Sequence, residues 1–288
     1  MALWHDRRGR FSPLRAVTLA LLIAPALTLL YFTATSDLGP RPRTEAIHEV
    51  GLWAIRFLML SLFVTPMRRI ARYAPLVDVR RMIGVGAFSY IALHLVLYMA
   101  DQLFDMGKVV SEIVLRYYLT IGFTAWLGFA ALAWTSNDWA VRGLGGIRWR
   151  QWHRLVYPVA VLGCIHYFMQ SKLEVFEPTI IGGIFLWLML YRILHWVAPR
   201  EAEFPLYVIA LSWFAVGLFV FFAEAVAFRI AFNAPVLRVL AVDFNFQAGI
   251  RPGWYVWGVG AIVVLIGAVR LKPSNRRMEL APARGAAE

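Results

Sequence analysis

The chain has 288 residues, of which 60% are hydrophobic and 16% charged, and its formal net charge is +12. A soluble domain has about half of its residues apolar and about a quarter charged, so an ordinary soluble globular protein is excluded. A nucleic-acid-binding protein is excluded as well, because the Lys and Arg residues do not gather on one polar face. They lie between long apolar runs and at the two ends, which indicates a protein embedded in a lipid bilayer.

Eight apolar stretches are long enough to cross a membrane, which takes roughly 20 residues for about 30 Å of hydrocarbon. In chain order they are 14–33, 47–65, 82–104, 115–134, 152–170, 178–197, 205–231 and 254–270. Arginines precede the first, as they would in a signal peptide, but its apolar run is long and no clear small-residue cleavage site follows. We therefore predict an all-α polytopic helical bundle whose first helix is retained. Residues 229–253 are expected to form a periplasmic loop or a re-entrant stretch.

The connections between the predicted spans alternate in charge. The connection after the second span, the connection after the fourth span and the C-terminal tail are all basic. In that order they contain Arg68, Arg69, Arg72, Arg80 and Arg81, then Arg142, Arg148 and Arg150, then Lys272, Arg276 and Arg277. Those after the third and fifth spans are mixed or acidic, with Asp101, Asp105 and Glu112, then Glu174 and Glu177. Positive charge stays on the cytoplasmic side, so we expect a multi-pass protein of the bacterial inner membrane with both termini in the cytoplasm.

Two histidines lie at matching depth on different predicted helices. At about 1.5 Å per residue, His94 lies roughly 18 Å into the third span and His166 roughly 20 Å into the fifth, both entered from the cytoplasm. A single intramembrane histidine is often a helix–helix hydrogen-bonding residue, but two at one depth can supply both axial ligands of a haem iron. We predict that His94 and His166 ligate one haem. Because Cys164 is the only cysteine, no CxxCH attachment motif occurs and the haem would be held non-covalently.

A further histidine, His153, lies at the cytoplasmic rim about 19 Å from His166 on the same predicted helix. That separation suits a second haem stacked below the first, but a structural role at the interface, beside Arg150 and Arg154, is the alternative. On an ideal helix the two rings point about 140° apart. Pro158 lies between them and can kink the helix, which leaves their relative direction open.

One charge lies inside a predicted span. Arg56 is about 14 Å below the periplasmic start of the second span, where an unpaired charge costs several kcal/mol. A haem propionate is one suitable partner, and the alternatives are snorkelling to the interface or pairing with another helix. His48, at the start of the same span, can ligate, hydrogen-bond a propionate or face water.

Four stretches resemble the MsrQ (YedZ) family of ferric-reductase-like membrane cytochromes b. They are AIHEVGLWAIRFLMLSLFVTPMRR, VRRMIGVGAFSYIALHLVLY, LRYYLTIGFTAWLGFAALAWTS and RWRQWHRLVYPVAVLGCIHYFMQSK. The resemblance covers about residues 14–197 in order. The last stretch is the most specific, because it combines RW, two histidines and HYxxxxK.

The resemblance implies a haem b electron-transfer subunit of a periplasmic protein-methionine-sulfoxide reductase system. Its soluble molybdopterin partner, MsrP, repairs oxidised envelope proteins, and electrons come from the quinone pool or a cytoplasmic flavin reductase, with FMN associated. The family's haem histidines correspond to His94, His153 and His166, and His48 also matches a family histidine. The family can carry Lys at Arg56. Arg56, His48 and Arg150 are therefore candidate contacts to haem propionates or to a flavin.

This chain departs from the family in two places. First, residues 205–270 add about two helices to the usual six. Second, a two-haem pattern needs another histidine in the third span, about 14 residues from His94, and Arg80 and Lys108 occupy those positions instead. We expect one haem, with a second depending on His153. The expected divisions are a cytoplasmic tail (1–13), a ferric-reductase-like haem-binding domain (14–200), a C-terminal extension (201–271) and a second cytoplasmic tail (272–288).

The sequence contains no Walker loop, HExxH motif or plausible nucleophilic triad, so catalysis on methionine sulfoxide is expected on the partner. A ferric or cupric reductase using the same haem with another acceptor is the nearest alternative. The absence of an FAD/NADPH domain argues against a self-sufficient reductase of that kind. A cofactor-free transporter or scaffold is the alternative from another class, and it predicts a colourless protein that tolerates histidine substitution.

Overall fold

A computed structural model describes residues 3–6, 8–172, 174–198 and 204–271 and consists of helices and short connections. The long helices are α1 (Pro13–Ala34), α2 (Pro42–Ile70), α3 (Val77–Asp101), α5 (Tyr117–Trp134), α7 (Val156–Gln170), α8 (Phe176–Val197), α9 (Leu206–Phe232) and α11 (Pro252–Leu271). The shorter ones are α4 (Met106–Leu115), α6 (Asp138–Trp152), α10 (Val236–Asp243) and the 3-10 turns η1 (Ala74–Leu76), η2 (His153–Leu155) and η3 (Phe246–Ala248). The predicted tail 272–288 lies outside the described residues.

Seven helical segments of the described chain are long and apolar enough to cross a bilayer: α1, α2, η1 with α3, α5, α8, α9 and α11. The chain is therefore an all-α, multi-pass membrane protein, as predicted. The fifth predicted span, 152–170, corresponds to η2 and α7, and α7 has 15 residues. At about 1.5 Å per residue it is roughly 22 Å long, shorter than the hydrocarbon layer, because the chain turns at η2 before α7 begins.

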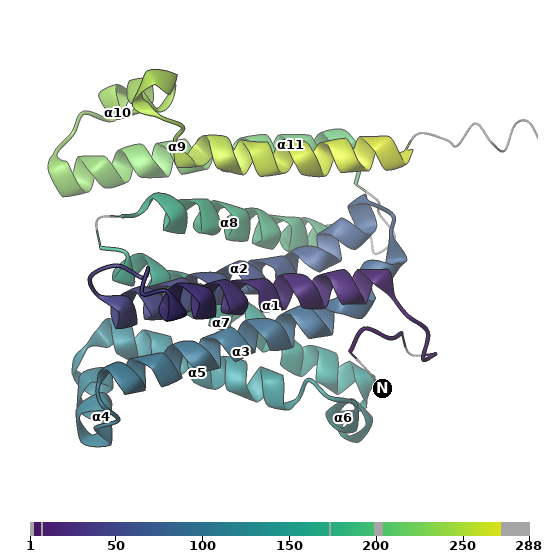
Figure 1. Ribbon diagram of the computed structural model, residues 1–288. Helices are drawn as coiled ribbons and strands as arrows, with labels where there is room; N and C mark the ends of the chain where they lie inside the picture. The colour runs from purple at the N-terminus through teal and green to yellow at the C-terminus, as the bar shows by residue number, and fades with distance from the viewer. Residues whose placement is uncertain (1–2, 7, 173, 199–203, 272–288) are drawn as a thin grey trace, which may run out of the picture.

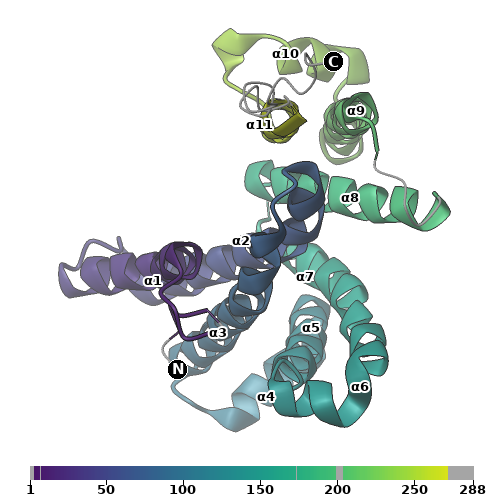
Figure 2. The same cartoon turned by 90° about the vertical axis from the view of Figure 1, so that its right-hand side faces the viewer.

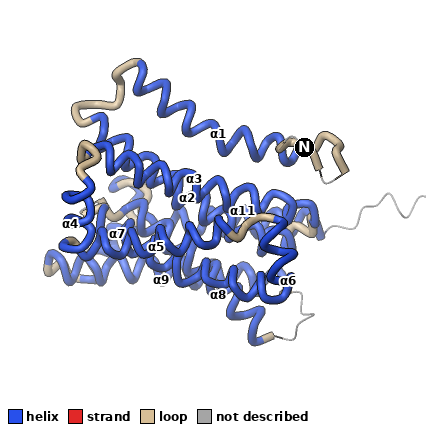
Figure 3. Tube along the Cα trace, turned by 90° about the horizontal axis from the view of Figure 1, so that it is seen from below, coloured by secondary structure: helices blue, strands red, loops and turns tan. Residues whose placement is uncertain are grey.

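The long helices lie side by side, so the bundle has two ends (Figure 1). One end carries α6, the start of α1 and the α2–α3 connection, and we call it the basic end after its arginines. The opposite end carries α4, α10 and the α7–α8 connection. Viewed along the helices, α9 and α11 form an outer layer on α8 at the side of the bundle away from α5 (Figure 2), and they also contact α2, where the Phe63 ring lies 6.5 Å from that of Trp213 on α9. Helix α1 lies at the edge of the bundle and diverges from its neighbours (Figure 3).

One continuous core joins the C-terminal helices to the rest. It includes Leu62 of α2, Leu188 of α8, Val216 of α9 and Val263 of α11, all buried. The indole of Trp187 on α8 stacks on that of Trp213 on α9, with ring centroids 4.2 Å apart and planes at 13°. Aromatic stacking and dispersion therefore fasten the extension to α8.

Glycines on α9 and α11 let the two helices approach closely, because each faces an aromatic ring of the other. A Cβ at Gly217 would lie 2.0 Å from Nε1 of Trp257, and one at Gly260 would lie 2.6 Å from the Trp213 ring. Small residues in contact with large ones are the usual way for membrane helices to pack, since lipid supplies little hydrophobic force between helices.

We expect Gly217→Ala to destabilise the protein by about 1–3 kcal/mol, the usual cost of overpacking, because the indole of Trp257 has to move. Thermal unfolding in detergent measures the effect. Gly258→Ala is the matched control in α11, because a Cβ there meets nothing within 4 Å. Equal unfolding temperatures for the two variants would contradict this packing.

A cluster of charged side chains joins α9, α10 and the start of α11 at the end of the bundle opposite the basic end. Arg251, just before α11, pairs with Glu224 of α9, and its Nε lies 3.4 Å from Oδ1 of Asp243 in α10. The Asp243 side chain is fully buried, and neither of its oxygens has a hydrogen-bond partner among the described residues. One guanidinium thus faces two carboxylates.

Burial raises the pKa of Asp243 above its ordinary value, although Arg251 opposes this shift. An acid whose pKa is raised by folding stabilises the fold fully below its unfolded pKa and loses that contribution as the pH rises through the folded value. We therefore expect wild-type stability to fall as the pH rises from about 4 towards neutral. Asp243→Asn should flatten this decline and give the more stable protein at neutral pH. If the stabilities of the wild type and Asp243→Asn changed equally with pH across this range, the raised pKa of Asp243 would be contradicted.

Candidate functional site

A cavity of about 950 Å³ lies between α2, α3, α5 and α7, and the start of α8 closes it. Its lining includes residues of the α7–α8 connection, so it lies in the half of the bundle opposite the basic end (Figure 1). Most of the wall is apolar, with Leu58, Ile91 and Phe129 among its side chains. A cavity of this size with an apolar wall and a few polar groups is typical of a cofactor site.

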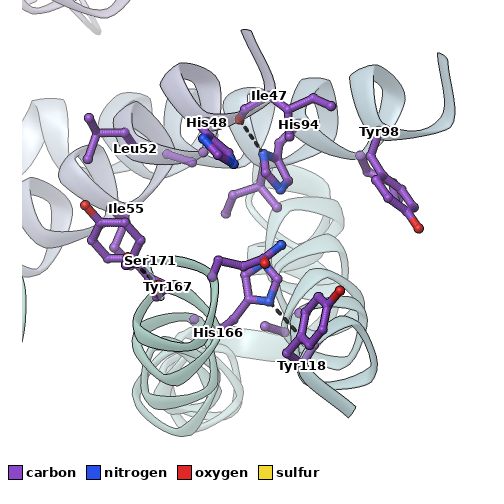
Figure 4. Close-up of a pocket in the computed structure, with 18 of the residues that line it drawn as sticks. Ile47, His48, Leu52, Ile55, His94, Tyr98, Tyr118, His166, Tyr167 and Ser171 are labelled. Atoms are coloured by element: carbon purple, nitrogen blue, oxygen red, sulfur yellow. Dashed lines mark hydrogen bonds between the residues drawn. The ribbon is translucent and has the colours of Figure 1, made fainter. Parts of the chain in front are cut away.

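His94 from α3 and His166 from α7 line opposite sides of this cavity and turn their rings towards each other (Figure 4). The ring centroids lie 6.4 Å apart and the ring planes are nearly perpendicular, at 85°. His94 and His166 thus face each other from different helices, in agreement with the prediction that they lie at one depth.

Each histidine is oriented by a backbone carbonyl of a neighbouring helix. Nδ1 of His94 lies 2.8 Å from the carbonyl oxygen of Ile47 on α2, and Nδ1 of His166 lies 2.9 Å from that of Tyr118 on α5. A carbonyl only accepts, so Nδ1 carries the proton and donates in both rings. Nε2 is then the unprotonated nitrogen that remains for a ligand in the cavity.

A glycine stands four residues after each of these carbonyls. A Cβ at Gly51 would lie 2.9 Å from Nδ1 of His94, and one at Gly122 would lie 2.6 Å from Nδ1 of His166. Residues four apart lie one turn above each other on a helix, so the glycine opens the space through which the imidazole reaches the carbonyl. The same arrangement of carbonyl, glycine and histidine thus occurs on both sides of the cavity.

The distance between the rings suits one metal ion held between them. Two bonds of about 2 Å from ring nitrogens to a metal, with each centroid about 1 Å behind its nitrogen, place the centroids about 6 Å apart. The described residues contain no group of three or more His, Cys, Asp or Glu side chains that could hold a bare metal ion. Two opposed histidines in a large apolar cavity instead fit a haem, whose macrocycle supplies the other four ligands.

The polar groups of the cavity lie mainly at its opening. His48, Ser171 and Lys172 line it there, and His48 is exposed. The hydroxyl of Tyr98 and Nε1 of Trp126, two other lining residues, are buried without a hydrogen-bond partner among the described residues. Buried donors normally have partners, so these two atoms are further evidence that the cavity takes a ligand with polar groups.

Arg56 pairs with another helix. Its guanidinium binds Glu177 of α8, with Nε 3.1 Å from Oε1, and its Cζ lies 4.9 Å from the ring centroid of Trp53. The hydroxyl of Tyr167 donates to the other oxygen of Glu177 at 3.4 Å. Glu177 and Tyr167 line the cavity, so Arg56 balances a carboxylate in its wall. Among the alternatives for Arg56, the structure shows pairing with another helix.

His153 and Arg150 do not line this cavity. The His153 ring stacks on Trp149 with centroids 3.8 Å apart, and its Nδ1 and Nε2 lie 3.1 Å from the Trp149 carbonyl oxygen and 3.3 Å from the hydroxyl oxygen of Ser136. Arg150 is exposed on α6. The structure thus brings together His94, His166 and His48 and leaves the other two at the basic end.

Sequence reasoning did not find the orienting carbonyls of Ile47 and Tyr118, the ion-pair partner Glu177, or Gly51. Backbone carbonyls leave no trace in a sequence. The sequence does carry one usable signal, a glycine at the depth of a histidine on a neighbouring span.

Comparisons with known proteins agree with this geometry. The family model described as a ferric reductase like transmembrane component matches residues 50–164. A protein of Rhodospirillum rubrum is 39% identical over 202 residues, which cover 69% of this chain and 93% of that protein, and it is named protein-methionine-sulfoxide reductase heme-binding subunit MsrQ. The chain belongs to the MsrQ family.

Other members of the family support the assignment. The protein of that name from Herminiimonas arsenicoxydans is 34% identical over 206 residues, or 94% of its length. The one from Caulobacter vibrioides is 37% identical over 182 residues, or 85% of its length. No solved structure matches the chain. Membership in this family agrees with the predicted ferric-reductase-like helical bundle.

Proposed function

We propose that this chain is the haem b-binding, electron-donating membrane subunit of a periplasmic protein-methionine-sulfoxide reductase. The observation that carries the proposal is the pair His94 and His166, opposed across an apolar cavity with centroids 6.4 Å apart. The MsrQ relatives are named as haem-binding subunits of such a reductase. Reduction of methionine sulfoxide would take place on the partner, an MsrP-like molybdopterin protein.

The residues around the cavity have distinct roles in this proposal. Nε2 of His94 and Nε2 of His166 would hold the haem iron, and the carbonyls of Ile47 and Tyr118 keep both rings in the tautomer that such binding requires. Haem, when bound, supplies a one-electron carrier, and two histidine ligands leave no open position for oxygen. Lys172, Ser171 and His48 at the opening are the candidate propionate partners.

We propose one haem per chain. Both ring nitrogens of His153 face groups of the protein itself, and the imidazole stacks on Trp149. Ligation by His153 would require the ring to leave these contacts. Among Arg56, His48 and Arg150, proposed from the sequence as cofactor contacts, only His48 lines the cavity.

The orientation follows from the arginines. The basic end faces the cytoplasm and the cavity lies in the periplasmic half, in the inner membrane of a bacterium. Electrons from quinol or from a cytoplasmic flavin reductase would leave close to the periplasmic partner.

A dithionite-reduced minus oxidised absorption spectrum of the detergent-purified full chain, with pyridine-haemochrome quantification, tests the proposal. We expect a sharp low-spin b-type signal and about one haem per chain. About two haems would return His153 to the ligand set. A colourless protein after haem-supplemented expression would refute the haem proposal and favour a cofactor-free transporter or scaffold.

The family model's description favours one alternative, a ferric or cupric reductase that uses the same haem. Stopped-flow oxidation of the dithionite-reduced chain separates the two functions. Rapid oxidation by an MsrP-like partner, with slow oxidation by ferric chelates, is expected. The reverse order of rates would establish the metal reductase.

A further inference from the structure

Three arginines from three helices converge at the basic end of the bundle. Arg68 is in the last turn of α2, Arg80 in the first turn of α3 and Arg192 near the end of α8. The short α2–α3 connection joins the helix ends that carry Arg68 and Arg80, and Arg192 reaches α2 at the carbonyl oxygen of Leu62 and α7 at the ring of Tyr157. All three arginines are half-buried, whereas Arg69, Arg72 and Arg81 nearby are exposed.

Arg192 is directed into the bundle. Its two terminal nitrogens donate to the carbonyl oxygens of Leu188 and Leu62, at 2.6 and 2.7 Å, and its Cζ lies 5.2 Å from the ring centroid of Tyr157. These bonds tie α8 to α2 and hold the guanidinium away from the water it would reach by snorkelling. The charge at this place is therefore built into the helix packing.

None of the three arginines forms an ion pair with a carboxylate in the part of the chain that the structure describes. The ion pairs there use Arg10, Arg56, Arg81, Arg116 and Arg251 instead. Three like charges at the edge of a hydrocarbon layer are costly without a counter-anion. Guanidinium groups bind phosphate through paired, charge-assisted hydrogen bonds, and basic pockets between membrane helices bind lipid headgroups.

We propose that Arg68, Arg80 and Arg192 bind a phosphate group at the basic end of the bundle. Two sources share this chemistry, the headgroup of an anionic phospholipid and a soluble phosphorylated molecule. Tyr157 of α7 stands beside the site, with its ring centroid 5.2 Å from Cζ of Arg192. The site is separate from the histidine cavity, so the proposal does not rest on haem binding.

Thermal unfolding of the detergent-purified full chain tests the site with three probes: phosphatidylglycerol, phosphatidylcholine and inorganic phosphate. We expect stabilisation by phosphatidylglycerol that exceeds that by phosphatidylcholine. Stabilisation by inorganic phosphate as well would identify a soluble phosphate as the ligand, and its absence would identify the headgroup. No stabilisation by either phosphatidylglycerol or phosphate would overturn the proposal.

Substitutions locate the effect. Arg80→Gln is expected to weaken binding about tenfold, because a hydrogen bond between charged groups is lost, and Arg80→Lys should keep more of the affinity. Arg148→Gln, at an exposed arginine of α6, is the matched control and should bind as wild type. Equal loss in the Arg80→Gln and Arg148→Gln variants would show non-specific attraction to the basic end and overturn the site. A cooperative thermal unfolding transition of Arg80→Gln without added ligand, near the wild-type temperature, shows that the variant has folded.

Glu201 and Glu203 follow α8 in the sequence and lie outside the described residues. They provide the test of a counter-anion supplied by the chain itself. If Glu201→Gln/Glu203→Gln leaves the affinity for phosphatidylglycerol or phosphate unchanged, the external ligand is the partner of the arginines. If the double variant binds phosphatidylglycerol or phosphate and the wild type does not, the carboxylates of Glu201 and Glu203 fill the wild-type site and the proposal is wrong.

Discussion

Replacing His94 or His166 with alanine is expected to abolish the low-spin bis-histidine haem signal. In the proposed site each ring supplies one of only two protein ligands, so the remaining histidine would leave the iron five-coordinate or the cavity without haem. The reduced-minus-oxidised spectrum and the haem content per chain measure the loss. We expect the content to fall at least tenfold or the spectrum to change to a high-spin form.

The control for this experiment is a histidine of the same bundle outside the cavity. His195 on α8 packs against Tyr191 and Phe204, with ring centroids 4.4 Å away in both cases, and does not line the cavity. His195→Ala should keep the wild-type spectrum. A wild-type spectrum in His94→Ala or His166→Ala would refute the ligand assignment, and a lost spectrum in His153→Ala with normal folding would add that residue to the site.

The second large effect is expected from the two glycines beside the histidines. Gly122→Ala places a methyl group 2.6 Å from Nδ1 and Cε1 of His166, and Gly51→Ala places one 2.9 Å from Nδ1 of His94. Either ring has to turn away, which breaks its bond to the carbonyl of Tyr118 or Ile47 and moves Nε2 out of line. The loss of a hydrogen bond that orients a metal-binding histidine typically costs 10- to 100-fold in metal affinity, so we expect a similar loss of haem occupancy.

The shorter approach makes Gly122→Ala the more severe of the two variants. Gly84→Ala is the matched control on α3, because its new Cβ meets only Oγ of Ser61, at 3.4 Å. Haem occupancy as a function of added haem, together with the unfolding temperature, separates a ligation defect from a folding defect. If Gly122→Ala bound haem like Gly84→Ala, the carbonyl-to-histidine bonds would not matter for ligation.

Much of the fold could be predicted from local sequence. Apolar runs of about 20 residues identify membrane spans irrespective of their neighbours, since every spanning backbone must satisfy its own hydrogen bonds. The seven segments that meet this length and composition agree with the prediction. The remaining predicted span, 152–170, contains α7, which is shorter because the chain turns at η2, a change of direction that apolarity alone does not reveal.

The depth of His94 and His166 was also predictable, because a helix rises by a constant amount per residue. The sequence alone thus determined the number of apolar segments, the asymmetry of their basic ends and the level of the two histidines. Tertiary structure decided which groups meet at each level: Arg56 with Glu177, His153 with Trp149, and each cavity histidine with one carbonyl. The rise per residue is a property of a single helix and so follows from its sequence. The rotation of each helix about its axis and the helices it packs against depend on contacts between segments far apart in the chain.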